Sequence, residues 1–591
     1  MTVSILRRYA FFMTALLFLG TTTGFGQDTD QPTAMPHATT PTAFDNPELV
    51  QHYQATITPE DLASHLFVFA SDYFEGRETA TRGQKLAATY LATQYRKMGV
   101  APKGTAQADH RFAPEAYLQP FDLHGRRLES ATVEVNVNGE TVASSVFSSS
   151  ENSGHTYLSF GTMPEIEGGV VFAGYGIADD ELGYNDYAAL EEQGLDFGGK
   201  WLLILRDEPL AGEDESLLST TDGKPSRWTT NGFTKLRVIF NRGTMPAGIL
   251  IVGDVGPRAV DVAAEAAQRA SHLKEDVGNL SLEEQQGSRR RFPPMYTIST
   301  ELADKILAST GRNIAELKQE IDENLTPAVF EVADVTVKST IEQEAFVTSS
   351  ENVAAFIEGS DPDLKDEVVV ISSHYDHVGV NEGADGDQIF NGADDDGSGT
   401  VTVLEIAEAF IKAKQDGNGP RRSILFLNVA GEEKGLLGSA YYTDHEPILP
   451  LENTVTNLNI DMIGRYDPTH PGEDNFYVYI IGSKLISEEL HEINQRVNEI
   501  TDINLDLNER FNSKDDPNRF YARSDHWNFG KNNIPFIFFF TGTHEDYHGV
   551  DDEPDKVEYD RMARIGQLIF ATAWQVANQD ERPTVSGTGF N

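Results

Sequence analysis

The stretch Val368-Val-Val-Ile-Ser-Ser-His374 is an apolar run that ends on an imidazole. It does not alternate between apolar and polar residues, which is typical of a strand buried on both faces of a sheet. Similar short runs begin at Ile424 and Phe536, and residues 400–414 have the helical spacing of apolar side chains. Strands that alternate with helices predict a three-layer α/β/α domain with a mainly parallel mixed sheet.

Potential metal ligands lie just beyond these apolar runs or immediately before the helical segment. In an open α/β sheet, ligands bind in the crevice beyond the carboxyl ends of the strands, so these side chains are expected to converge on one pocket. The candidate ligands are His374, Asp395, Glu433, Asp461 and His548.

The types of these residues narrow the choice of metal. Imidazoles mixed with carboxylates favour zinc or a similar transition ion, because calcium and magnesium prefer shells made only of oxygen. A catalytic zinc ion needs three protein ligands, so five residues that share one carboxylate would serve two ions. An acidic motif is weak evidence by itself in a chain with 93 Asp and Glu residues, but the joint placement at strand ends predicts a two-metal hydrolase site.

The same residues belong to longer motifs that carry a family resemblance. These are His374-Tyr-Asp376, Asn391-Gly-Ala-Asp-Asp-Asp-Gly-Ser-Gly399, Gly431-Glu-Glu433, Asn459-Ile-Asp-Met462 and Tyr547-His548. In order and spacing they resemble the motifs of metallopeptidase family twenty-eight, the di-zinc exopeptidases that include secreted bacterial aminopeptidases. The segment Ala70-Ser-Asp-Tyr-Phe-Glu-Gly-Arg77 is similar to the N-terminal segment of that family, and residues 522–529 are similar to its substrate-pocket loop.

The resemblance implies a role for each position. His374 and Asp461 would hold one zinc ion, Glu433 and His548 would hold the other, and Asp395 would bridge them. Glu432 is the candidate general base, because adjacent residues at a strand end project apart. Asp376 is placed to orient an imidazole or a carboxylate, and Tyr547 either stabilises an oxyanion or only packs.

A long segment interrupts the catalytic pattern with short β runs and little catalytic chemistry. Within it, Val170-Val-Phe-Ala-Gly-Tyr-Gly-Ile177 resembles the start of the core of a protease-associated (PA) domain, which implies a small β-rich insertion. The predicted organisation is a signal peptide at 1–26, a disordered leader at 27–47, a catalytic domain at 48–122 and 345–580, the insertion at 123–344 and a tail at 581–591.

The N-terminus predicts export. Arg7-Arg8 precede an apolar stretch that ends near Gly20, and the small residues Gly24 and Gly26 fit a cleavage site. This is the pattern of a secretory signal peptide, so a secreted or periplasmic location is expected. The chain has no Cys, so stability cannot come from disulfides, and lipid anchoring through cysteine is excluded.

Several functions remain open at this stage. A family relative that has lost its metals could be a receptor-like module, but all the ligands and the base are present in this sequence. A glutaminyl cyclase has a related site, and a carboxypeptidase would need a cation for the terminal carboxylate. Arg523 could supply that cation, or it could contact Asp525 and hold its loop in place, and we favour the second interpretation. An aminopeptidase that acts on peptides is therefore expected, while its side-chain preference and oligomeric state cannot be inferred.

The net charge of −47 bears on partners and environment. Such a surface repels nucleic acid and anionic membranes, so neither is an expected partner. Asp385 and Asp387 could bind calcium, but a solvated acidic loop is the favoured interpretation because the required spacing of oxygen ligands is missing.

The acidic surface also generates a first prediction. If it is an adaptation to salt, the thermal midpoint should rise steeply between low and near-molar sodium chloride, because the Debye length shrinks to about 3 Å at 1 M and the carboxylates stop repelling one another. Differential scanning calorimetry across a salt series measures this, and a flat response would leave the acidity as an aid to solubility alone.

Overall fold

A computed structural model describes residues 39–110, 112–231, 233–273, 279–284, 292–381, 386–470 and 476–586. The chain forms two units, Met1–Thr39 and Thr40–Asn591, and nearly all described residues belong to the second. The predicted signal peptide lies outside the described residues, as does the end of the predicted tail. Across the described ranges, no helix is both long enough and apolar enough to cross a membrane.

The region predicted to be the catalytic domain, residues 48–122 and 345–580, is built on a mainly parallel sheet, here called the catalytic sheet, whose central strands are buried along their whole length. In spatial order, β20, β17, β15 and β16 are parallel neighbours, while β18 and β14 pair antiparallel at the two sides. The strands are β15 (Val368–His374), β16 (Ser423–Val429), β17 (Thr454–Ile460), β18 (Tyr477–Ile481), β19 (Asp506–Asn508), β20 (Phe536–Phe540) and β14 (Val329–Ile357). This arrangement confirms the predicted sheet.

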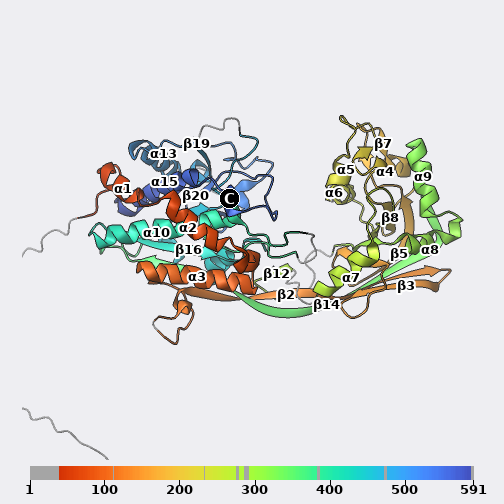
Figure 1. Ribbon diagram of the computed structural model, residues 1–591, viewed down its shortest axis with the longest axis horizontal. Coiled ribbons are helices and arrows are strands. Elements are labelled where there is room, and N and C mark those ends of the chain that lie inside the picture. The colour runs from red at the N-terminus through yellow and green to blue at the C-terminus, as the bar shows by residue number, and fades with distance from the viewer. Residues whose placement is uncertain are drawn as a thin grey trace, which may run out of the picture. The chain divides into compact units, whose positions relative to one another are not determined.

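Helices cover both faces of this sheet, and Figure 1 labels those of one face. Alternate residues of a strand point to opposite faces, and Val369 and Ile371 of β15 pack in one core with α10 and α15, whereas Val368 and Val370 pack in another with Tyr442. One face carries α1 (Pro47–Gln54), α2 (Pro59–Phe69), α3 (Arg82–Met98), α10 (Gly399–Gln415), α13 (Glu488–Ile500) and α15 (Tyr559–Asn578); the other carries η5 (Tyr441–His445) and α14 (His526–Gly530). The three-layer α/β/α prediction is therefore confirmed.

The predicted disordered leader ends earlier than expected. Ala43 is fully buried, the Thr40 hydroxyl donates to the Gly419 carbonyl at 2.6 Å, and the Trp574 indole donates to the Pro41 carbonyl at 3.0 Å. Residues 40–46 are thus part of the packed domain, which corrects the boundary at 47. Their partners lie far away along the chain, so local composition could not reveal this packing.

Two long strands connect the insertion to the catalytic sheet. Strand β2 (Leu118–Val137) pairs antiparallel with β14 from Val137 opposite Val335 to Leu118 opposite Val353. Strand β14 also pairs with β16 of the catalytic sheet and with β5 (Glu165–Ala173) of the insertion. The predicted boundaries at 123 and 345 therefore fall inside continuous strands rather than in loops.

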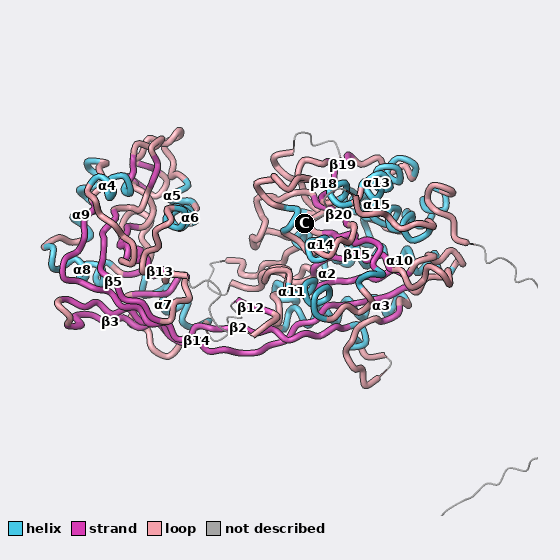
Figure 2. Tube along the Cα trace, turned by 180° about the vertical axis from the view of Figure 1, so that it is seen from behind, coloured by secondary structure: helices cyan, strands magenta, loops and turns pink. Residues whose placement is uncertain are grey.

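The insertion contains parallel strands and helices, so it is less purely β than the sequence predicted. Strands β5, β8, β11 and β13 run parallel, and parallel neighbours require crossover connections, which are commonly helical. The helices stand out in the tube view (Figure 2). Besides five strands of two or three residues, its elements include β3 (Glu140–Ser148), β4 (Thr156–Phe160), β5 (Glu165–Ala173), α4 (Asp186–Glu192), β8 (Trp201–Leu205), α5 (Arg227–Thr230), α6 (Phe233–Asn241), β11 (Gly248–Val252), α7 (Val262–His272), β13 (Met295–Ile298), α8 (Thr300–Leu307) and α9 (Ile314–Asn324).

Candidate metal centre

The predicted metal ligands lie together at the carboxyl edge of the catalytic sheet. Each is placed by a strand end or by the loop before a helix. His374 ends β15, Asp395 precedes α10, Glu433 follows β16, Asp461 follows β17, and His548 lies beyond β20. Because the carboxyl ends of parallel strands meet at one edge, residues far apart in sequence can share one pocket.

The carboxylate of Asp395 faces two donor clusters at once. Its Oδ1 lies 3.2 Å from His374 Nε2, which is also 3.6 Å from Asp461 Oδ1. Its Oδ2 lies 3.1 Å from His548 Nε2, which is also 3.2 Å from Glu433 Oε2. Two groups of nitrogen and oxygen donors that share one carboxylate are the arrangement required for a bridging ligand.

A further histidine, which the sequence did not single out, joins the second cluster. His377 is fully buried, and its Nδ1 lies 3.0 Å from Glu433 Oε1 and 3.9 Å from Asp395 Oδ2. Its Nε2 has no hydrogen-bond partner among the described residues. The signal was present in the sequence, because His377 follows His374 by three positions in the segment that leaves β15.

The electrostatics of the centre favour a bound cation. Burial by itself would lower the pKa of His548, but contacts with Asp395 and Glu433 raise it to about 10. Burial would raise the pKa of Glu433, yet contacts with His377 and His548 lower it to about 2. The imidazoles thus keep the Glu433 carboxylate ionised by placing positive charge against it. Imidazole nitrogens and carboxylate oxygens in this arrangement fit the donor preferences of zinc.

Glu432 lines the same pocket without being a member of either donor cluster. Its backbone N–H donates to Asp376 Oδ1 at 3.2 Å. Burial, together with the charges of Glu433 and Asp461, raises the pKa of the Glu432 carboxyl well above its usual range. A carboxylate with a raised proton affinity beside a cation site is suited to accepting and returning protons.

Asp376 orients this part of the site in two ways. Its backbone carbonyl lies 3.1 Å from His374 Nδ1, whereas its carboxylate is 3.9 Å away from the same nitrogen. The carboxylate instead accepts from the Thr79 hydroxyl at 2.7 Å and from Glu432 N–H. The imidazole is therefore oriented by the main chain, and the carboxylate orients the residue proposed as base.

An apolar pocket adjoins the donor clusters. Its walls include Met462, Phe520, Phe538 and Phe540, beside Asp395, Asp461 and Glu432. Such a mixture of apolar walls and a few convergent polar groups is typical of a small-molecule or side-chain binding site.

Tyr547 and Arg523 also line this pocket, and they contact each other. The Arg523 guanidinium donates to the Tyr547 hydroxyl at 3.3 Å, and the Tyr547 ring stacks on His548 with centroids 4.0 Å apart. Asp525 accepts a hydrogen bond from the Ser439 hydroxyl instead. The expectation that Arg523 braces Asp525 is not met, because the two side chains point to different neighbours.

Comparison with known proteins assigns the region that carries these ligands. Residues 352–573 match the model of Peptidase family M28. The M28 segment includes every predicted metal ligand, and the match confirms the resemblance drawn from the motifs.

Relatives of known description cover parts of the chain. Aminopeptidase YwaD of Bacillus subtilis is 26% identical over 231 residues, which are 37% of this chain and 43% of the relative. A probable zinc metalloprotease of Pyrenophora teres f. teres is 28% identical over 287 residues, 42% of this chain and 56% of the relative. The matches thus span about half the length of these relatives.

Two aminopeptidases are among the solved structures that are similar to this chain. The aminopeptidase of Aneurinibacillus sp. strain AM-1 has a TM-score of 0.46 and 16% identity, with 91% of this chain and 99% of that chain covered. The zinc aminopeptidase BSAP of Bacillus subtilis has a TM-score of 0.47 and 17% identity, with 88% and 95% covered.

Among the described residues, the acidic loop considered as a calcium site contributes to no cluster of potential metal ligands. Asp385 lies outside the described residues, and Asp387 Oδ1 accepts from the Ile389 N–H at 3.1 Å.

The buried side chain of Arg77 forms hydrogen bonds to two loops of the M28 segment. The Arg77 guanidinium donates to the carbonyls of Tyr375 at 3.0 Å, Asn391 at 2.7 Å and Gly392 at 2.8 Å. These carbonyls belong to the segment after His374 and to the loop that leads to Asp395. Arg77 comes from the N-terminal motif at residues 70–77, so that motif holds the relative position of two candidate ligands.

This network yields a second prediction. Arg77→Lys should lower the free energy of unfolding by about 2–4 kcal/mol, because one ammonium cannot reach all the carbonyls that the guanidinium satisfies. Hydrogen exchange at amides 391–396 should also become faster, which mass spectrometry measures. Arg82→Lys is the matched control, since the Arg82 side chain is 70% exposed, and it should change stability by less than about 0.5 kcal/mol. Unchanged exchange in Arg77→Lys would remove Arg77 from this role.

Proposed function

We propose that this protein is a zinc-dependent aminopeptidase that hydrolyses peptides with two co-catalytic zinc ions. The observation that carries the proposal is the sharing of the Asp395 carboxylate between two donor clusters beside Glu432, within an M28 segment. The descriptions of the relatives, an aminopeptidase and a zinc metalloprotease, support it. The proposal includes export through the predicted signal peptide at 1–26 and a PA-like insertion.

The donor clusters define which residues would hold each ion. His374 and Asp461 would hold one zinc ion, Glu433 and His548 would hold the other, and Asp395 would contact both. When bound, the ions polarise a peptide carbonyl and lower the pKa of a bound water. His377 Nδ1 lies 3.0 Å from Glu433 Oε1, and in the tautomer protonated at Nδ1 it would donate to this carboxylate and fix its orientation.

The remaining steps belong to residues of the chain itself. Glu432 removes a proton from the attacking water, the water oxygen bonds to the carbonyl carbon, and the peptide C–N bond breaks as Glu432 returns the proton to the leaving amine. The Tyr547 hydroxyl, which accepts from Arg523, is directed to donate to the carbonyl oxygen as negative charge develops there. The apolar pocket would receive the side chain of the residue that is removed.

The charge of the pocket favours an amino end over a carboxyl end. Asp395, Asp461 and Glu432 line it and can accept hydrogen bonds from a protonated α-amine. Arg523 also lines it and is the observation that favours a carboxypeptidase as second candidate, but its guanidinium is committed to the Tyr547 hydroxyl and the Phe520 ring. The carboxylates outnumber this cation, so we favour the aminopeptidase.

A third prediction concerns the base. Glu432→Gln keeps the size of the side chain but cannot accept a proton, so turnover should fall by about 10²–10⁴ while zinc content stays at the wild-type level. Asp395→Ala is the informative comparison, because loss of the shared carboxylate should reduce zinc content at both sites. Stopped-flow or steady-state kinetics and elemental analysis on the same preparations separate the two effects. Near-normal turnover of Glu432→Gln would exclude it as the base.

A fourth prediction concerns which end of the peptide is recognised. A peptide with a free N-terminus and an apolar first residue should be cleaved, and its N-acetylated counterpart should be cleaved at least about 100-fold more slowly, because acetylation removes the ammonium charge that the carboxylates bind. Mass spectrometry of the products over time measures this. Release of the C-terminal residue first would favour the carboxypeptidase and leave the zinc hydrolase intact.

A further inference from the structure

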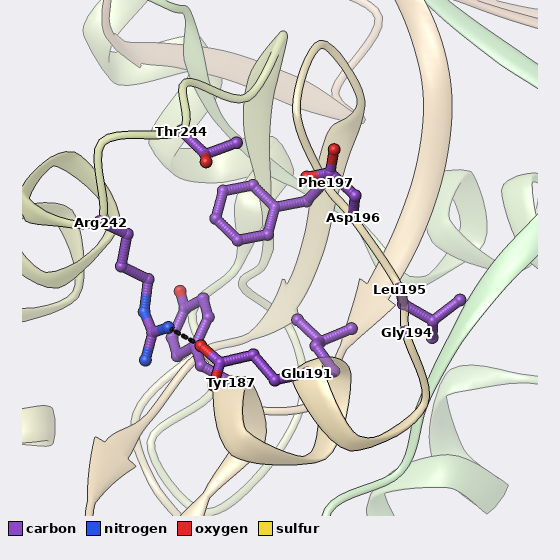
Figure 3. A pocket seen from close by; sticks show the side chains of 9 residues that line it. Tyr187, Glu191, Gly194, Leu195, Asp196, Phe197, Arg242 and Thr244 are labelled. Atoms are coloured by element: carbon purple, nitrogen blue, oxygen red, sulfur yellow. Dashed lines mark hydrogen bonds and ion pairs between the residues drawn. The ribbon is translucent and has the colours of Figure 1, made fainter.

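A second pocket lies in the insertion, away from the residues of the metal centre. It is formed by helix α4, the loop at residues 194–197 and the segment at 242–244 that follows α6, and its volume is about 270 Å³ (Figure 3). This is close to the lower end of the volumes that small-molecule sites occupy, so the space suits a ligand of few atoms.

The floor of this pocket contains a buried hydroxyl without a partner. Tyr187 is 1% exposed, and its hydroxyl makes no hydrogen bond with any described residue. Its ring packs edge-on against Phe197, with centroids 6.1 Å apart, and Figure 3 shows the hydroxyl directed towards the pocket interior on the side of Phe197. A buried hydroxyl that lacks a partner is destabilising, and a phenylalanine would fill the same space without that cost. The hydroxyl therefore indicates a ligand.

A second unpaired donor lies beside it. The Arg242 guanidinium sits over the Tyr187 ring, 4.4 Å from its centroid, and Arg242 Nη1 donates to Glu191 Oε1 at 2.7 Å. The buried Nε–H of Arg242 has no partner among the described residues. A hydroxyl and a guanidinium N–H that are both free to donate suit the oxygen atoms of a carboxylate.

The rest of the lining is complementary to an ammonium group and to a short apolar chain. Glu191 and Asp196 are exposed acidic residues at the rim, and Asp196 uses one oxygen to accept from the Gly198 N–H. Leu195 and Phe197 supply apolar surface. One small pocket thus offers donors, acceptors and apolar walls.

We propose that this pocket binds a free apolar α-amino acid. Its carboxylate accepts hydrogen bonds from Tyr187 and from the Nε–H of Arg242, its ammonium pairs with Glu191 or Asp196, and its side chain packs on Leu195 and Phe197. The proposal goes beyond the peptidase activity and does not depend on it, although apolar amino acids are the products that such a peptidase would release.

Equilibrium dialysis of the full-length zinc-loaded protein against radiolabelled L-leucine tests the proposal. Tyr187→Phe should weaken leucine binding at this site by about tenfold or more, because one hydrogen bond to a charged group is lost. Its thermal midpoint should not fall, because the hydroxyl has no protein partner to lose. Tyr157→Phe is the matched control: it removes another hydroxyl in the insertion, one that donates to Glu265 at 2.6 Å, and it should leave leucine binding unchanged.

Competition and kinetics separate this pocket from the metal centre. Unlabelled L-leucine should displace the label, whereas L-leucinol, which lacks the carboxylate, and N-acetyl-L-leucine, which lacks the ammonium, should not. The inhibition constant of leucine for peptide hydrolysis should be the same in Tyr187→Phe and in the wild type. Identical leucine isotherms in the wild type, Tyr187→Phe and Arg242→Gln, or a lowered thermal midpoint of Tyr187→Phe, would overturn the proposal, and neither result would bear on the peptidase.

Discussion

The mutual repulsion of buried carboxylates is the constraint around which the metal centre is organised. The side chains of Asp395, Glu433 and Asp461 are at most 11% exposed, and like charges at such a site repel more strongly than in bulk water. The neighbouring imidazoles of His374, His377 and His548 place positive charge against Asp395 and Glu433 and so lower the pKa values of both carboxyls despite their burial. The strand ends, the buried histidines and the loop contacts of Arg77 all serve to hold these charges at fixed positions.

Fixing the ligands requires unfavourable backbone conformations next to them. His548 has a φ of 53°, and Met462, directly after Asp461, has a φ of 55°. Such left-handed conformations cost of order 1 kcal/mol or more for residues other than glycine, and they persist where the surrounding packing allows no alternative. At Gly392 a side chain is not possible, because a Cβ would lie 2.4 Å from the Asp395 carbonyl oxygen. The stability of the packed sheet offsets the free-energy cost of these strained backbone conformations.

The insertion follows a different principle, because it has a core of its own. Trp201 and Tyr296 belong to this core, which is separate from the core beneath the metal centre. The two parts share β14, which pairs with strands of both. A ligand pocket on α4 can therefore exist independently of the catalytic chemistry, since the side chains that form it come only from the insertion.

The sequence by itself determined the α/β class and the positions of the candidate ligands with their zinc-type donor atoms, because apolar runs, their order and the residues beyond them are local properties of the chain. The boundaries of the insertion, its helical content and the packing of residues 40–46 depended on pairings between distant segments, which local patterns do not encode. Three side-chain contacts were likewise decided only by the tertiary structure. They are the approach of His377 to Glu433, the contact of Arg523 with Tyr547 rather than Asp525, and the hydrogen bonds of Arg77 to two loops. Side-chain direction at a loop depends on which neighbours the fold brings within hydrogen-bond distance, and that information exists only once the sheet has assembled.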